Sequence, residues 1–254
     1  MSRYADNSRS IILISDGLTG DFDSNSHSRF INRLPVDLDC QTTEFEMALT
    51  RIKFVNAIYN LPESEEHIFR LTTLDLTELD VRVPPGYYPV KDILLYVNSK
   101  LDNVKMGINE SSQKVTINNS DVNDLKIELS NTLSNILGFE SESILSISAG
   151  GKVTAPFICN PHPNDQLYVY SSMLSAEHIV GGGLTNLLCI CPIKSNTFNE
   201  TVVYEPNNLT FLPIKRQHFL YSTIYICNHL GHEVSFERGP LEVHLRLRRV
   251  SPFL

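Results

Sequence analysis

The chain has 254 residues, of which 42% are hydrophobic and 20% are charged, a composition that suits one large β domain or two small domains with a buried core. The formal net charge of −8 argues against a nucleic-acid-binding protein, because such proteins usually present a basic face to the phosphates. No apolar stretch reaches the roughly 18 residues that a membrane-spanning helix needs. The polar start MSRYADNSRS predicts no secretory signal.

The first ambiguous element is TTEFEMALTRIKFVNAIYN, residues 42–60, which follows an expected strand at 10–15. As a strand it places Phe45, Met47 and Leu49 on one face, and the alternation then slips by one residue near Thr50. As a helix it places its apolar residues on one stripe at a spacing of about 3.6 residues. The many short strands expected elsewhere favour the strand, with a β-bulge at the slip.

The middle of the chain has a different pattern from its flanks. After an expected strand at 67–74 and the turn sequence VPPGYYP, residues 90–102 place apolar side chains on one helical stripe. QKVTINN and DLKIELS then suggest a hairpin, and residues 131–139 suggest a short helix ended by Gly138. A compact α+β segment is therefore expected at 84–148.

The C-terminal third is the clearest β region. Short runs rich in β-branched and aromatic residues alternate with turn sequences containing Gly, Pro and Asn. The runs are QLYVYSS (166–172), NLLCICPI (186–193), LTFLPI (209–214), FLYSTIYICN (219–228) and LEVHLRLRR (241–249). The last alternates apolar and polar side chains throughout, as a half-buried antiparallel strand does.

These elements predict a mainly β protein, a single jelly-roll β-sandwich with a small α+β insertion. In this arrangement residues 1–83 form the first half of the jelly roll, residues 84–148 the insertion, and residues 149–254 the second half.

Three polar motifs resemble metal sites but depart from the required patterns. DFDSN places Asp21 and Asp23 at alternate positions like the start of a calcium loop, but the turn glycine and the final bidentate Glu are missing. The motif is best interpreted as a polar turn, with a looser cation site as the alternative.

CNHLGH offers Cys227, His229 and His232 as zinc ligands but lacks a fourth ligand at normal spacing, so a hairpin turn is expected. Cys189 and Cys191 point to the same face of one strand and are expected to be small buried hydrophobes. The five cysteines are an odd number and widely spread, which favours reduced thiols in a cytosolic or nuclear setting.

The sequence gives no support for catalysis. It contains no G-x-S-x-G elbow, and the GGG at 181–183 is not followed by the Lys-Ser/Thr of a phosphate-binding loop. We therefore expect no enzyme activity, no catalytic residues, no cofactor and no metal.

Several pieces, taken in order, resemble one protein family. They are SIILISDGLTGDFDSNSHSRFINRLPVDLD, FEMALTRIKF, VPPGYY followed by a helix, LSNILGF and GHEVSFERGPLEVHLRLRR. Together they resemble the penton, or minor capsid, proteins of Polinton/Maverick elements and of the related adintoviruses and virophages, over nearly the whole chain. The resemblance also supports the strand interpretation of residues 43–54.

The resemblance implies a virion protein that forms homopentamers at the five-fold vertices of an icosahedral capsid, among trimers of a separate double jelly-roll major capsid protein. Assembly is then expected in the host nucleus or cytoplasm, without secretion. The family has no catalytic residues to transfer. The alternatives are a jelly-roll carbohydrate- or receptor-binding attachment module and, from a third class, a cupin-like metal enzyme, for which the scattered histidines lack the required cluster.

Such a vertex needs a rigid unit that associates head to tail and closes a ring. Tyr168 and Tyr170 are candidates for contact area on its side walls, unless their rings pack within the domain. Arg246, Arg248 and Arg249 form a basic face that either meets acidic neighbours or packaged DNA, or is only a solvated strand face.

Overall fold

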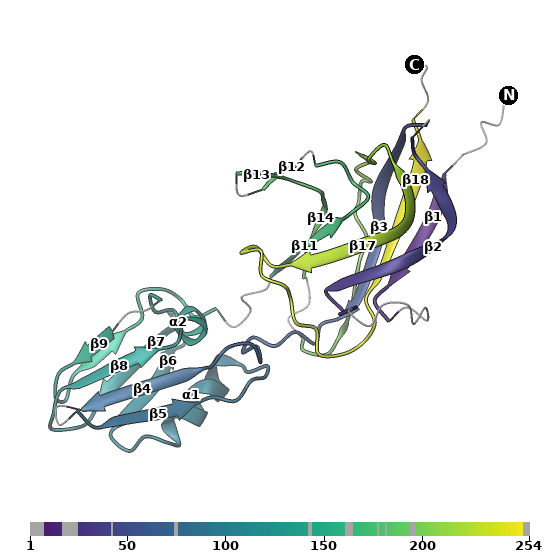
Figure 1. Ribbon diagram of the computed structural model, residues 1–254. Coiled ribbons are helices and arrows are strands. Elements are labelled where there is room, and N and C mark those ends of the chain that lie inside the picture. Colours follow the sequence, from purple (N-terminus) through teal and green to yellow (C-terminus); the bar gives the residue numbers. More distant parts are fainter. Residues whose placement is uncertain are drawn as a thin grey trace. The chain divides into compact units, whose positions relative to one another are not determined.

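The computed structural model describes residues 8–16, 25–41, 43–73, 76–141, 144–160, 165–176, 178–180, 182–193 and 197–250. The chain divides into two compact units, each with its own hydrophobic core. Unit 1 comprises Met1–Ile58 and Asn164–Leu254, and unit 2 comprises Tyr59–Pro163. Figure 1 shows the elements of both units.

Unit 1 is built on two antiparallel sheets. The first has the strand order β1-β18-β3-β15, with the short β16 also pairing with β3. Its strands are β1 (Arg9–Ile14), β18 (Glu242–Arg249), β3 (Phe45–Val55), β15 (Thr201–Tyr204) and β16 (Leu212–Pro213). The second has the order β14-β11-β17-β2, formed by β14 (Leu187–Pro192), β11 (Gln166–Ser171), β17 (His218–Cys227) and β2 (Arg29–Asp39).

The two sheets of unit 1 enclose one core between them. Figure 1 shows β17 and β2 lying across β3, β18 and β1. Both sheets contribute fully buried side chains to this core, for example Phe54 and Leu245 from the first and Phe30, Val169 and Ile224 from the second. The predicted mainly β fold and its β-sandwich architecture are confirmed. A separate hairpin of β12 (His178–Val180) and β13 (Gly183–Thr185) connects β11 to β14.

The ambiguous stretch is the bulged strand β3, so the helix interpretation is wrong. Its register against β18 shifts where Arg51 pairs with His244 and Leu49 pairs with Leu245, which leaves Thr50 as the extra residue. The Thr50 hydroxyl donates a hydrogen bond to the His244 carbonyl at 3.1 Å. The bulge lets Leu49 and Ile52 both face the core, as the slipped alternation predicted.

Unit 2 combines two antiparallel sheets with two short helices around the second core. One sheet has the order β5-β4-β8-β9 and the other the order β10-β7-β6. The elements are β4 (Ile68–Thr73), β5 (Glu78–Arg82), α1 (Val90–Asn98), β6 (Val104–Asn109), β7 (Lys114–Asn119), β8 (Leu125–Leu129), α2 (Asn131–Leu137), β9 (Ile144–Ile147) and β10 (Lys152–Thr154).

Two expectations about this region differ from the structure. QKVTINN and DLKIELS do not form a hairpin, because they are β7 and β8 and belong to different sheets. The compact unit spans Tyr59–Pro163 rather than 84–148, since β4 pairs with β5 and β8 and so belongs to unit 2. Apolar alternation identifies a strand but not the strand with which it pairs. No helix in the described part of the chain is long and apolar enough to cross a membrane.

Gly138 ends α2 as predicted, in a left-handed conformation with φ of +81°. A Cβ at this position would lie 2.4 Å from the Phe157 carbonyl oxygen. We therefore expect Gly138→Ala to lower the free energy of unfolding by about 1–3 kcal/mol, because it adds backbone strain to a close approach. Urea unfolding monitored by circular dichroism measures this change.

Gly107 in β6 provides the matched control, because a Cβ there meets nothing within 4 Å and its φ lies outside the left-handed region. Gly107→Ala is expected to leave the free energy of unfolding unchanged or slightly higher. Equal losses for the two alanine variants would contradict the assignment.

Candidate functional site

The outer face of the second sheet of unit 1 is rich in tyrosine. Strand alternation turns Val169 into the core and Tyr168 and Tyr170 outward. On the neighbouring β17, Tyr225 pairs with Tyr170, and residues two apart share a face. We call the following set the tyrosine face: Tyr168, Tyr170, Tyr221, Tyr225, Ile190, Arg29 and Arg33.

The two tyrosines singled out from the sequence have different surroundings. The rings of Tyr170 and Tyr225 lie with their centroids 6.1 Å apart, and the Tyr225 hydroxyl donates to the Gly231 carbonyl at 3.3 Å. Burial, together with the neighbouring Cys227 thiol, raises the pKa of Tyr170 to about 12. Both tyrosines are half-buried side chains of the outer face, and Tyr170 is neutral at pH 7 and packs against Tyr225.

Sequence reasoning did not identify the contribution of β17. The signal was present in YSTIYIC, where Tyr221, Thr223 and Tyr225 alternate with buried residues. What the sequence did not provide was the pairing of β17 with β11 and β2, which brings these residues beside Tyr170 and the arginines. Tyrosine and arginine are the residue types enriched at the energetic centres of protein interfaces.

The outer face of the first sheet carries paired charges instead. Lys53 Nζ lies 2.9 Å from Glu242 Oε1, and Arg248 Nε donates to Glu46 Oε2 at 2.8 Å. The Arg248 guanidinium also lies over the Phe211 ring, 3.7 Å from its centroid. The predicted basic face is thus largely bonded within the unit, which gives the expected contact with packaged DNA no added support.

Arg246 and Arg249 complete that face. The Arg246 guanidinium donates to the Ser8 hydroxyl at 3.1 and 3.2 Å, and Arg249 is an exposed side chain at the end of β18.

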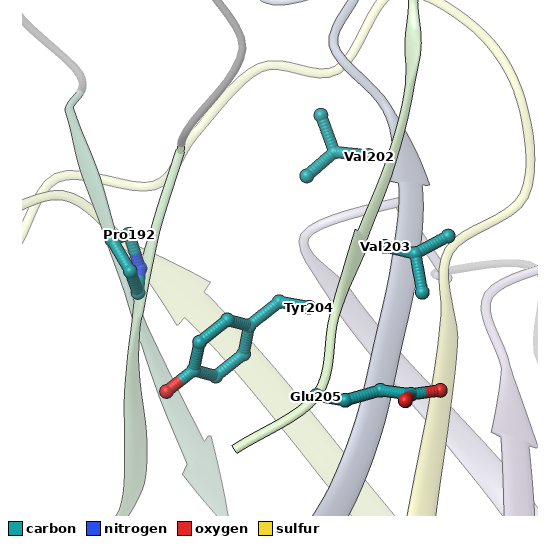
Figure 2. Close-up of a pocket in the computed structure, with 5 residues that line it drawn as sticks. All are labelled: Pro192, Val202, Val203, Tyr204 and Glu205. Atoms are coloured by element: carbon teal, nitrogen blue, oxygen red, sulfur yellow. The ribbon is translucent and has the colours of Figure 1, made fainter. Parts of the chain in front are cut away.

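A pocket of about 310 Å³ opens between β14 and β15, which are the edge strands of different sheets. Figure 2 shows Tyr204 reaching from β15 toward Pro192 of β14, and Glu205 pointing away on the other side of the strand. The Tyr204 hydroxyl is hydrogen-bonded to the Cys189 thiol. Burial raises the pKa of both groups. Val202 and Val203 complete the lining.

Of the metal-like motifs, CNHLGH lies within the described residues. Asp21 and Asp23 lie outside the described residues. His229 and His232 belong to a turn in which the backbone amides of Leu230 and His232 both donate to Asn228 Oδ1 at 3.0 Å. Among the described residues, no group of three or more His, Cys, Asp or Glu side chains is placed to hold a metal ion.

The cysteines of the candidate motifs are buried or half-buried thiols. Cys191 and Cys227 are buried, Cys189 is half-buried, and all the cysteines are unbridged. Burial raises the pKa of the Cys189 and Cys227 thiols. Gly182 lies in the turn between β12 and β13 with a left-handed φ of +86°, and Gly183 begins β13.

Comparison with known proteins gives a likeness of fold. No family model matches the chain, and no curated protein matches its sequence. The crystal structure of the mavirus penton protein is similar over 96% of this chain and 99% of its own, with a TM-score of 0.51 and 11% identity. The D2–D3 domains of the Escherichia coli flagellar cap protein FliD align with 87% of this chain and 99% of their own length, at 9% identity. Their TM-score of 0.29 is too low to indicate a shared fold.

The chain is therefore a mainly β protein with the fold of a capsid protein. Its predicted resemblance to virophage penton proteins is confirmed as a likeness of fold to the mavirus penton.

The raised pKa of Tyr170 predicts a specific pH dependence. In the unfolded chain tyrosine ionises near pH 10, whereas Tyr170 in the folded chain ionises near 12. The stabilisation is complete below pH 10 and is lost as the pH rises toward 12, because only the unfolded chain then releases the proton. We expect Tyr170→Phe to make the fall in unfolding free energy over this range less steep.

Denaturant unfolding at a series of pH values measures this slope, and each variant at pH 7 serves as its own baseline. Identical slopes for wild type and Tyr170→Phe would contradict the burial of this hydroxyl.

Proposed function

We propose that the chain is a penton protein, a structural protein that forms the homopentameric vertex of an icosahedral capsid. The observation that carries the proposal is the similarity in fold to the mavirus penton protein over 96% of the chain. In this role the pentamer sits among double jelly-roll major capsid proteins in the virion and has no enzyme activity. The likeness gives no support to the attachment-module alternative.

The strand order supports a single jelly roll in unit 1. Numbered in chain order through β1, β2, β3, β11, β14, β15, β17 and β18, the first strand pairs with the eighth, the second with the seventh, the third with the sixth and the fourth with the fifth. This is the order obtained when one long antiparallel hairpin is folded over itself into two sheets, as in jelly-roll capsid domains. Unit 2 lies in the sequence between the third and fourth of these strands, which supports the interpretation of this segment as an insertion into the jelly roll.

The shape of the sandwich suits ring assembly. Head-to-tail contacts between two different surfaces generate a closed ring when the rotation between copies is one-fifth of a turn. The rigid walls and edges of the sandwich would supply these surfaces, and the tyrosines of the tyrosine face would provide aromatic area for contact with a neighbour.

Net charge opposes this assembly, and it is unevenly distributed. Residues 59–163 contain 14 Asp and Glu against 8 Lys and Arg, so unit 2 carries −6 of the total of −8. A ring of five copies repels itself mainly through its five unit 2 domains, while each unit 1 contributes only −2. Repulsion of this kind is long-range and is screened by salt.

We therefore expect rings of about 144 kDa, five chains of 28.7 kDa, whose fraction rises as ionic strength increases from about 0.01 M to about 0.15 M. Over this range the Debye length falls from about 30 Å to about 8 Å. Mass photometry at a fixed protein concentration measures the fraction. Single chains at every ionic strength would refute the vertex proposal, and rings that weaken with salt would refute the dominance of net charge.

A further inference from the structure

We propose that the two opposite edges of the unit 1 sandwich are the complementary halves of the contact between neighbouring copies in the ring. This inference rests on the proposed pentamer and identifies the surfaces that join it. One edge is formed by β1 and β2 and the other by β14 and β15, because these are the terminal strands of the two sheets.

The edge of β1 and β2, which we call the basic edge, is flanked by exposed apolar side chains on the outer face of the first sheet and by two arginines of the tyrosine face on the second. Ile12 and Ile14 are 55% and 38% exposed, although both belong to a strand of a folded sheet. Arg29 and Arg33 are exposed on β2, where Ile31 lies between them. Among the described residues, neither arginine forms an ion pair, so both charges are available to a partner.

The basic edge cannot simply add a strand from another copy. The Asn32 side chain bonds both the amide and the carbonyl of Ile14, at 3.1 and 3.0 Å. The Asn25 side chain does the same for Ile31, at 2.9 and 3.1 Å. These amides occupy the backbone groups of one residue on each edge strand, which hinders the addition of a regular strand there. We therefore infer that a partner on this edge is bound mainly by side chains.

The opposite edge, which we call the acidic edge, has the matching properties. It contains the pocket of about 310 Å³ beside Pro192 and Tyr204, and Val203 on its outer side is 47% exposed. Glu205 lines the pocket, and its side chain is 64% exposed, with Arg51 3.9 Å away as an ion-pair partner. Asp165 is exposed, and its carbonyl accepts the Ile193 amide at the end of β14.

The partner that fits the basic edge is thus the acidic edge of a second copy of this chain. Exposed isoleucines meet the pocket beside Pro192, Val203 and Tyr204, and two arginines meet two exposed carboxylates. Because the two edges belong to different strands on opposite sides of the sandwich, the contact is heterologous and leads to a ring rather than a two-fold dimer. The paired charges act at short range and are screened less than the net repulsion between unit 2 domains.

Charge reversal tests the pairing. The acidic-edge variant is Asp165→Lys/Glu205→Lys, the basic-edge variant is Arg29→Glu/Arg33→Glu, and the combined variant carries all four changes. At 0.15 M ionic strength each single-edge variant is expected to need about tenfold or more higher concentration for half ring formation, because every interface then opposes like charges. The combined variant is expected to return to within about threefold of wild type. Mass photometry gives the ring fraction.

The mixture of the two single-edge variants makes the test more specific. A favourable interface then forms only between unlike variants, which must alternate around the ring. A ring of five cannot alternate throughout, so an equimolar mixture is expected to give fewer complete rings than the combined variant. Full rescue in the mixture would contradict a heterologous contact in a ring of five.

Two controls separate the inference from its assumptions. The control variant Glu63→Lys/Asp102→Lys changes two exposed acids of unit 2. It alters the net charge as much as the acidic-edge variant does but leaves both edges unchanged. It is therefore expected to form rings at least as well as wild type. If a reversed variant fails to give the wild-type circular dichroism, the neutral pairs Asp165→Asn/Glu205→Gln and Arg29→Gln/Arg33→Gln are used instead, with a weaker loss expected. Wild-type rings that ignore every edge variant would overturn only this inference, whereas a wild type without rings would overturn the proposed function as well.

Discussion

The fold of unit 1 depends on the last strand pairing with two strands near the start of the chain. β18 lies between β1 and β3, and its apolar residues Val243, Leu245 and Leu247 are at most 1% exposed. Without this strand, β1 would have no partner and β3 would lose its longest neighbour, so the first sheet and its half of the core would not form. This pairing also joins two strands that precede unit 2 in the sequence to a strand that follows it.

The separation into two cores allows the two units to differ in character. Unit 1 is nearly neutral and has exposed apolar side chains on its edges and on the β12–β13 hairpin. Unit 2 carries most of the negative charge and has a charged outer sheet face, where Arg70 bonds Asp80 at 2.8 Å. Because most of the negative charge lies on unit 2, the sandwich of unit 1 keeps little net charge.

Two polar motifs that resembled binding sites, CNHLGH and the basic run of β18, form turns and ion pairs within unit 1. The histidines of CNHLGH lie in a turn organised by Asn228, and Arg248 of the basic run is bonded to Glu46 on the adjacent strand. Two other asparagines, Asn25 and Asn32, have the more distinctive role of closing the backbone of edge strands. Their importance could not be seen in the sequence, because an asparagine in a strand or loop has no pattern that identifies the backbone it will bond.

From the sequence alone one could predict the mainly β fold, the longer alternating strands, the bulge at Thr50 and the end of α2 at Gly138, because alternation and turn chemistry are local properties. The long strand β2 and most of the short strands were not predicted. The assignment of β4 to unit 2, the placement of β7 and β8 in different sheets and the position of Tyr225 beside Tyr170 emerged only from the folded chain. The same holds for which strands are edges, and so for which side chains are exposed there. The physical reason is that strand pairing is made by backbone groups common to all residues, so many pairings satisfy one local pattern and the shared core selects among them.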